Sequence, residues 1–187
     1  MKLRKGFTLV ELLIVIVIIG VLAGAMLLAS GAATASAEAS NIVSNLRSLQ
    51  SASLMLFADH MDVLQSSGIT TLDIGGTAVD MTTAVNGNTG PLGALTVYTA
   101  NPTAPVWASY SFVILGDAPT LAGRAWWVGT DVDRLDVGRR LQGRRENVGL
   151  FNAASAISSA AVIAPTANFT AGNPRVYMLI RSPVAGS

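Results

Sequence analysis

The sequence predicts an α+β protein in which a long N-terminal helix packs on an antiparallel sheet. An apolar run over residues 7–28 continues without a proline, as an amphipathic pattern, to about Gln65. Beyond it, short aliphatic and aromatic segments alternate with clusters of glycine, proline and asparagine, which is typical of antiparallel strands joined by turns. The length of 187 residues suits one modest domain with a tail rather than two full domains.

The first element is an apolar segment long enough to cross a membrane. A helix over residues 7–28 would span about 33 Å. The cations Lys2, Arg4 and Lys5 precede it, and the positive-inside bias then predicts a cytoplasmic N-terminus. These residues leave a plain signal anchor and a cleaved secretory signal peptide open. Neither gives a role to Glu11, whose charge costs roughly 3 kcal/mol or more in lipid.

Residues 32–67 are predicted to continue the helix beyond the membrane as an amphipathic segment. Mostly apolar side chains recur at steps of three and four: Ile42, Leu46, Leu49, Ser53, Leu56, His60 and Leu64. Polar residues occupy much of the remainder: Asn41, Ser44, Asn45, Arg47, Ser48 and Ser51. A helix from Phe7 to about Gln65 would be roughly 88 Å long. Its first half needs lipid or neighbouring subunits, and its second half needs a head domain to cover the apolar stripe.

Residues 68–187 are predicted to form that head, around a sheet of about three or four strands. Turn residues crowd positions 68–105, with one candidate strand at Leu95–Thr99. Clearer strand patterns follow, the first two close enough for a hairpin: Tyr110–Leu115, Ala125–Gly129 and Val176–Ile180. Because side chains alternate along a strand, Trp126 and Trp127 face opposite sides, and one of them is expected outside the core.

An additional helix is predicted near residues 133–148 of the head. Asp133 or Asp136 lies near its start, and Gly149 ends it. Its buried side is expected to consist of Val137, Leu141 and Val148. Residues 152–174, rich in alanine, serine, proline and asparagine, are expected to form a loop.

Metal-binding chemistry has little support in the sequence, and no cofactor is expected. The chain has no cysteine and a single histidine, His60, so a conventional zinc site is nearly excluded. Oxygen ligands of the kind calcium takes are present in Asp131, Asp133 and Asp136, and in Asp117. They do not follow the EF-hand spacing, and they precede a helix, where acids act as caps and complement the helix dipole. They are therefore weak calcium candidates, with capping the favoured interpretation.

The sequence also argues against catalysis and nucleic-acid binding. Neither a nucleophile motif nor a phosphate-binding loop is present, so the chain is not expected to be an enzyme. The basic cluster Arg139, Arg140, Arg144 and Arg145 could contact DNA, but a solvated face with pairs such as Asp136–Arg140 explains it better. Without residues 1–6, the chain has 9 arginines and 11 acidic residues, a mildly acidic balance of −2 that disfavours nonspecific nucleic-acid binding.

The run Gly6-Phe7-Thr8-Leu9-Val10-Glu11-Leu12 resembles the processing site of type IV prepilins and related pseudopilins. The resemblance implies that residues 1–6 are a leader, cut after Gly6 by a membrane peptidase that also methylates the amine of Phe7. It implies that residues 7–31 form a transmembrane and polymerisation helix, and that Glu11 pairs with the Phe7 amine of a neighbouring subunit. It also implies a ladle-shaped pilin-like fold, and local loss of helix after Gly20 in the assembled form.

The resemblance further implies a function and a set of partners. The chain would be the major pilin of an extracellular filament for adhesion, aggregation or twitching motility. Before assembly it would span the inner membrane once. Its partners would be the prepilin peptidase and methylase, identical subunits, membrane lipid, an assembly platform and its ATPases. Two alternatives remain: the major pseudopilin of a type II secretion system, and a minor pilin whose head binds DNA or a surface.

Overall fold

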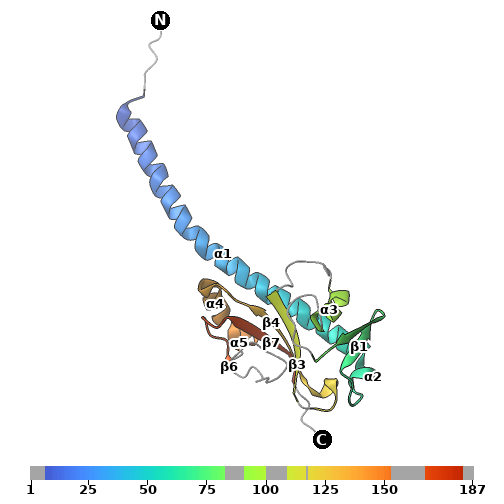
Figure 1. Ribbon diagram of the computed structural model, residues 1–187. Coiled ribbons are helices and arrows are strands. Elements are labelled where there is room, and N and C mark those ends of the chain that lie inside the picture. The colour runs from blue at the N-terminus through green and yellow to red at the C-terminus, as the bar shows by residue number, and fades with distance from the viewer. Residues whose placement is uncertain (1–6, 83–90, 100–108, 117, 153–166, 183–187) are drawn as a thin grey trace.

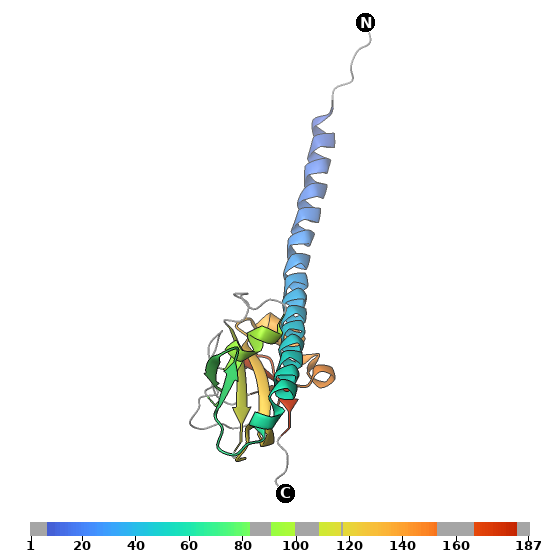
Figure 2. The same ribbon diagram turned by 90° about the vertical axis from the view of Figure 1, so that its right-hand side faces the viewer.

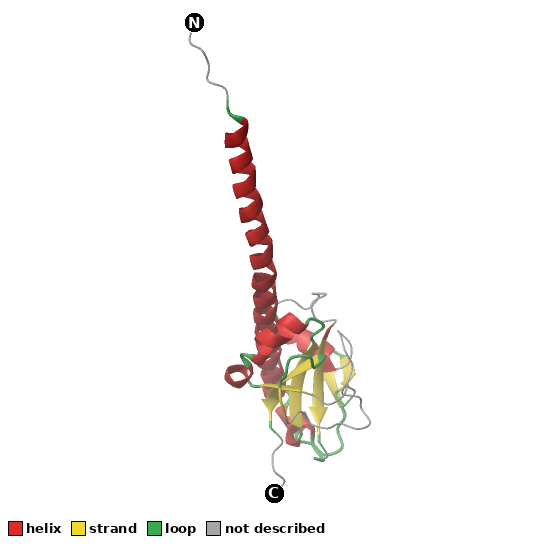
Figure 3. Ribbon diagram, turned by 90° about the vertical axis from the view of Figure 1, so that its left-hand side faces the viewer, coloured by secondary structure: helices red, strands yellow, loops and turns green. Residues whose placement is uncertain are grey.

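A computed structural model describes residues 7–82, 91–99, 109–116, 118–152 and 167–182, although not the side chains of residues 28–30. Gly6 and the rest of the predicted leader therefore lie outside the described residues. The chain forms a long helix whose C-terminal half packs on a head of strands and short helices (Figure 1). The strands of the head lie on one side of this helix in both side views, while a short helical segment projects on its other side (Figures 2 and 3). The predicted α+β fold class is confirmed.

Helix α1 spans Leu9–Asp59, a continuous 51 residues and about 77 Å. It bends gently without a break (Figure 1). The segment from Gly20 to Leu28 is helical here, so the melting implied for assembled pilins is not present in this structure. The helix ends earlier than the predicted Gln65, because His60 leaves helical geometry and the four-residue helix α2, Met61–Leu64, follows it.

The predicted apolar stripe of α1 faces the head. Five of its members are buried and two are partly buried, and the adjacent Ala35, Ala39 and Ala52 are buried as well. Polar side chains reinforce the contact, since the Asn45 amide donates to the Tyr110 hydroxyl at 3.0 Å. The Gln50 amide donates to the Leu179 carbonyl at 3.1 Å. Asn45 is thus part of the helix–sheet contact rather than of the solvated face.

Among the described residues the main sheet has five strands, more than the three or four expected. They are β3 (Tyr110–Leu115), β4 (Ala125–Asp131), β5 (Leu150–Asn152), β6 (Ala167–Asn168) and β7 (Arg175–Arg181). All pairings are antiparallel, in the order β3-β4-β7-β5-β6. The predicted hairpin pairs Tyr110 with Thr130 and Leu115 with Ala125. The extra strands, β5 and β6, are only three and two residues long, too short to show a period of two.

The turn-rich segment contains a hairpin that the sequence did not reveal. Strands β1 (Thr71–Ile74) and β2 (Thr77–Asp80) form a separate two-stranded sheet. Its turn is Gly75-Gly76, with φ of +60° and +83°, a geometry that glycine adopts readily. The strand expected at Leu95–Thr99 is wrong: helix α3 (Pro91–Leu95) and a 3₁₀ turn (Thr96–Tyr98) occupy this stretch. Proline at the first helical position favours that outcome.

The helix expected near residues 133–148 is two helices. Helix α4 spans Leu135–Gln142, and α5 spans Arg145–Val148. Gly143 separates them, and Gly149 ends α5 in the left-handed conformation with φ of +75°. Val137 and Leu141 are buried as expected, while Val148 is partly buried. A further 3₁₀ turn, η3, covers Leu121–Gly123.

The sheet buries side chains on both of its faces. Trp126 packs edge-on against Phe57 of α1 and Phe112 of β3, on the face that α1 covers. Trp127 lies on the opposite face in a second apolar cluster, edge-on to Phe151 at 5.5 Å. The two tryptophans do alternate, but the expectation that one lies outside the core is wrong, since Trp127 is only 5% exposed. On this face Trp127 is buried among side chains of the sheet itself, including Val113, Leu115 and Tyr177.

Candidate assembly site at the helix N-terminus

The first turn of α1 is closed by a reciprocal pair of side-chain hydrogen bonds. The Glu11 N–H donates to the Thr8 hydroxyl oxygen at 3.2 Å, and the Thr8 backbone N–H donates to Glu11 Oε2 at 2.9 Å. The Thr8 hydroxyl also donates to Glu11 Oε2, at 2.7 Å. Threonine followed three residues later by glutamate is the capping-box signature, and it satisfies backbone donors that otherwise lack partners at a helix start.

The capping box places Glu11 in the first turn of the helix rather than inside its apolar run. The carboxylate therefore sits at the positive end of the helix dipole, where a negative charge is stabilised. Thr8 is the functional residue that sequence reasoning overlooked here. The pattern Thr8-Leu-Val-Glu11 was its signal, directly before an apolar run.

The N-terminal half of α1 is an uncovered apolar surface. Phe7 is 89% exposed, and the large apolar residues from Leu9 to Leu27 are all at least half exposed. This helix is long and apolar enough to cross a membrane by length and composition. Such a surface is stable only when lipid or other apolar helices cover it. Phe7 and Glu11 therefore lie together at one end of an apolar rod, four residues apart.

Two of the candidate calcium ligands, Asp131 and Asp136, are used in other contacts, while Asp133 is exposed and Asp117 lies outside the described residues. Arg175 Nε is 2.5 Å from Asp131 Oδ1, and Arg134 Nη2 is 2.6 Å from Asp136 Oδ2. Asp136 also accepts from the Val137 N–H at 2.9 Å, which is a local capping contact. Its hydrogen bonds from the Arg134 guanidinium lower the pKa of the Asp136 carboxyl. Among the described residues, no group of three acidic, histidine or cysteine side chains could hold a metal ion.

The basic cluster surrounds the junction of α4 and α5. The predicted Asp136–Arg140 pair does not form, because Asp136 pairs with Arg134 instead. Arg134 also reaches Glu38 of α1 at 2.8 Å, and the Arg144 guanidinium donates to the Ser40 hydroxyl at 2.9 Å. Through these contacts, α4 is fixed to the middle of α1. His60 takes no part in any such cluster, since it forms the C-cap of α1.

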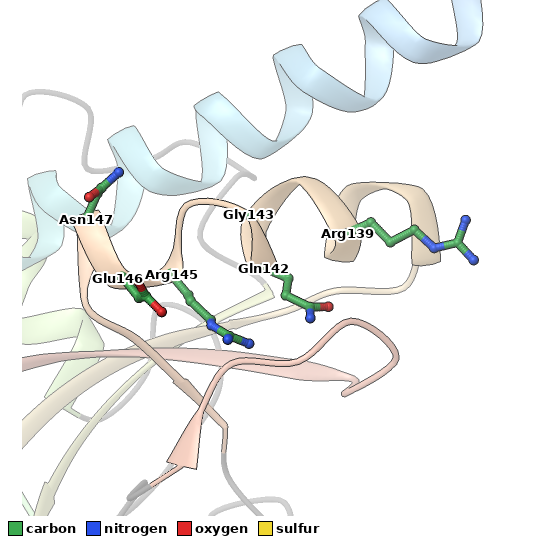
Figure 4. A pocket seen from close by; sticks show the side chains of 6 residues that line it. All are labelled: Arg139, Gln142, Gly143, Arg145, Glu146 and Asn147. Atoms are coloured by element: carbon green, nitrogen blue, oxygen red, sulfur yellow. The ribbon is translucent and has the colours of Figure 1, made fainter.

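An open hollow of about 430 Å³ lies on the outer side of this junction. It is lined by Arg139, Gln142, Gly143, Arg145, Glu146 and Asn147. Gln142 and Arg145 extend on the side of α4 and α5 that faces away from α1 (Figure 4). Two of these side chains are fixed, since Gln142 Oε1 accepts from the Ala171 N–H and Arg145 donates to the Phe169 carbonyl. The hollow offers charge and hydrogen bonds, without a nucleophile beside a base.

Comparison with known proteins bears on the N-terminal segment alone. Residues 1–27 match the family model described as the prokaryotic N-terminal methylation motif. The chain carries a prepilin-type N-terminus. This motif implies a precursor that is processed by a prepilin peptidase, anchored in the membrane by its apolar helix and passed to a pilus-type assembly machinery. No curated protein and no solved structure matches the chain.

Proposed function

We propose that this chain is the major subunit of a type IV pilus, cut after Gly6, N-methylated on Phe7 and polymerised into an extracellular filament. One observation carries the proposal: the N-terminal half of α1 is an exposed apolar rod with a single carboxylate, Glu11. This carboxylate lies in the helix turn next to Phe7, and cleavage after Gly6 would give Phe7 a free amine. A rod with this surface requires neighbours, and identical neighbours would each supply one amine and one carboxylate.

Assembly would exchange one partner of Glu11 for another. In the free subunit the Thr8 N–H and hydroxyl hold the Glu11 carboxylate. In the filament Glu11 of one subunit would pair with the positive Phe7 amine of another. Both charges are costly alone in an apolar core, so breaking the pair costs several kcal/mol. The pair therefore favours one axial offset between subunits and penalises the others.

Cleavage after Gly6 is a precondition of this pairing. The leader blocks the Phe7 amine, and its three cations, Lys2, Arg4 and Lys5, hold the N-terminus on the cytoplasmic side of the inner membrane. The assembly platform and its ATPases would extract the processed subunit from lipid. The role of the chain itself is structural and non-catalytic, and the filament would serve adhesion, aggregation or twitching motility.

The proposal is tested by the abundance of the chain in filaments sheared from intact cells. A major pilin should be the dominant protein of that fraction. A minor pilin would be a trace component beside a different dominant subunit, and a secretion pseudopilin would be absent from surface filaments of cells at native expression. Either of these last results would contradict the proposal. A matched strain without the prepilin peptidase should retain the uncut precursor in its membranes and yield no filaments.

A further inference from the structure

The two ends of the head differ in charge. The proximal arginine surface consists of Arg139, Arg140, Arg144 and Arg145. It lies next to the segment of α1 around Glu38 and Ser40, which Arg134 and Arg144 contact. The distal acidic end consists of Asp59, Asp62, Asp73 and Asp80, at the end of α1, in α2 and in the β1–β2 hairpin. Figure 1 shows α4 and α5 toward the free half of α1, with α2 and β1 at its other end. From residue 38 to residue 59 the helix rises about 32 Å.

Within the described part of the subunit, no ion pair neutralises Arg139 or Arg140 on one surface, or Asp59, Asp62 or Asp73 on the other. The ion pairs found there all involve Arg134 or Arg175. All four acids of the distal end are exposed. Two arginines near that end, Arg124 and Arg181, keep their positive charge, since they donate only to the neutral carbonyls of Ala118 and Ala122, but the four acids outnumber them. The distal end therefore presents more negative than positive charge.

The proximal surface has the opposite excess. Arg139 and Arg140 are exposed and make no ion pair within the described residues. Arg144 and Arg145 are partly buried, and each is fixed by a hydrogen bond to a neutral acceptor. The acids on and beside these two helices are Glu38 and Asp136, which share Arg134, the exposed Asp133, and Glu146 on the rim of the hollow, so with Arg134 included five arginines face four acids. The hollow beside Arg139 and Arg145 is open and could admit a side chain from outside.

We infer that the proximal arginine surface of one subunit docks against the distal acidic end of another copy of the same chain. The inference rests on the proposed filament, in which every α1 points the same way. Two surfaces about 32 Å apart cannot meet within one subunit, and salt screens charges beyond about 10 Å at 0.1 M. Between copies stacked along a common axis, however, the end of one head faces the start of the next. Such a head-to-tail contact is heterologous, and its repetition builds an open helical filament.

Through this contact the head would help to set the axial offset between neighbouring subunits. The Phe7–Glu11 pair would fix the offset at one end of the rod, and opposite charges would select it again at the head. A contact of solvent-exposed charges weakens as salt rises, whereas an amine–carboxylate pair in an apolar filament core is screened much less. Filaments should therefore shed subunits more readily in high salt without losing the buried pair.

Substitutions that reverse the charges of the two ends, made in the full-length chain in cells, test the inference. The variant R139E/R140E and the variant D62R/D73R should each lower the yield of sheared filaments by about tenfold or more, because like charges would face each other. The combination of all four substitutions should restore the yield. Matched controls that keep each charge, R139K/R140K and D62E/D73E, should assemble normally. Melting of each detergent-solubilised full-length variant, followed by circular dichroism, shows whether the head still folds.

The outcomes separate this inference from the proposed function. If the original chain forms no filaments, the proposed function fails. If it forms filaments and both reversals assemble as well as their controls, only the head-to-tail contact is overturned. The contact is also overturned if folded R139E/R140E assembles poorly and the distal reversal does not rescue it. That last result would assign the arginines to another anion, such as lipid phosphate beside the membrane helix.

Discussion

At the scale of single residues, Glu11 has a local partner in Thr8, and the proposed filament would give it a second. A lone carboxylate in lipid is costly, yet here the Thr8 N–H and hydroxyl donate hydrogen bonds to the Glu11 carboxylate at the start of the helix. Because Thr8 lies within the same turn, this arrangement needs no other subunit. Assembly would therefore have to replace the Thr8 hydrogen bonds with a stronger interaction. A charge pair between Glu11 and the amine created by cleavage would be such an interaction.

Replacing Glu11 separates insertion from assembly. We expect Glu11→Ala to insert and to be cleaved normally, while filament yield falls to a small fraction, because a buried Phe7 amine would lack its counter-charge. Glu11→Gln is the matched control for shape, since its amide oxygen can still accept from Thr8, and it should fail as well. The measurements are precursor size on a gel and sheared filament yield. Normal yield from either variant would show that the charge pair is dispensable.

Asp136 predicts a pH dependence for the head. Hydrogen bonds from Arg134 lower the pKa of the Asp136 carboxyl, so the folded state favours its charged form. Its contribution is fully present above the unfolded value of about 3.9 and is lost as the pH falls through the lower folded value. The free energy of unfolding of detergent-solubilised protein should therefore fall less steeply between about pH 5 and pH 2 in Asp136→Asn than in the original chain. Identical pH slopes would contradict this assignment.

At the scale of elements, the sequence predicted the helices and strands whose hydrophobic pattern extends over enough residues to be recognised. The long helix, the β3–β4 hairpin and β7 all carry runs of apolar residues at the expected spacing. The missed elements are short or depend on tertiary contacts. Strands β5 and β6 exist because β7 offers an edge, and Leu150 pairs with Met178. The split between α4 and α5 at Gly143 was visible in the sequence but overlooked, because a single glycine is tolerated inside many helices.

The candidate site shows the same division. Gly6, Phe7, Thr8 and Glu11 all fall within the six positions 6–11, so a local motif is enough to find them. The contact of Arg134 with Glu38 joins residues 96 positions apart, and only the packing of α4 on α1 brings them together. Both faces of the sheet bury side chains for a similar reason. Alternation assigns Trp126 and Trp127 to opposite faces, but it does not reveal that each face has its own apolar cluster.

Two glycines should respond oppositely to the same substitution. A Cβ at Gly129 of β4 would overlap the Tyr177 ring and lie 2.9 Å from the Val176 carbonyl oxygen. Gly129→Ala should therefore destabilise the head by about 1–3 kcal/mol. At Gly138, inside α4, the nearest atom would be 3.6 Å away, so Gly138→Ala should be neutral or stabilising by up to about 1 kcal/mol. Thermal melts of the two variants measure the difference, and equal effects would contradict the packing described for β4 and β7.

At the scale of the whole molecule, the chain divides into two parts. The N-terminal half of α1 exposes its apolar side chains, whereas the head buries its own in a core. Side chains of α1 are exposed up to the point where Ala35 becomes buried, apart from residues 28–30, whose side chains are not described. From there on, the helix is part of the head's core. The same helix thus serves a membrane or a filament with one half and a folded domain with the other.

This division predicts where the chain can be cut. A chain of residues 32–187 should be folded and monomeric in water, because it keeps the buried side chains from Ala35 onward. A chain of residues 47–187 lacks Ala35, Ala39 and Leu46, and it should lose about 3 kcal/mol or more of stability. Sedimentation and urea unfolding of the two chains provide the comparison. Aggregation of the longer piece, or equal stability of both, would contradict the boundary.

In the proposed filament the mature subunit begins at Phe7, and its new amine is the partner of Glu11. Intact-mass and N-terminal peptide analysis of the chain recovered from sheared filaments tests this claim most directly. We expect a chain that lacks residues 1–6 and carries one methyl group on the amine of Phe7. A filament subunit that retains the leader, or that begins at any other residue, would contradict it.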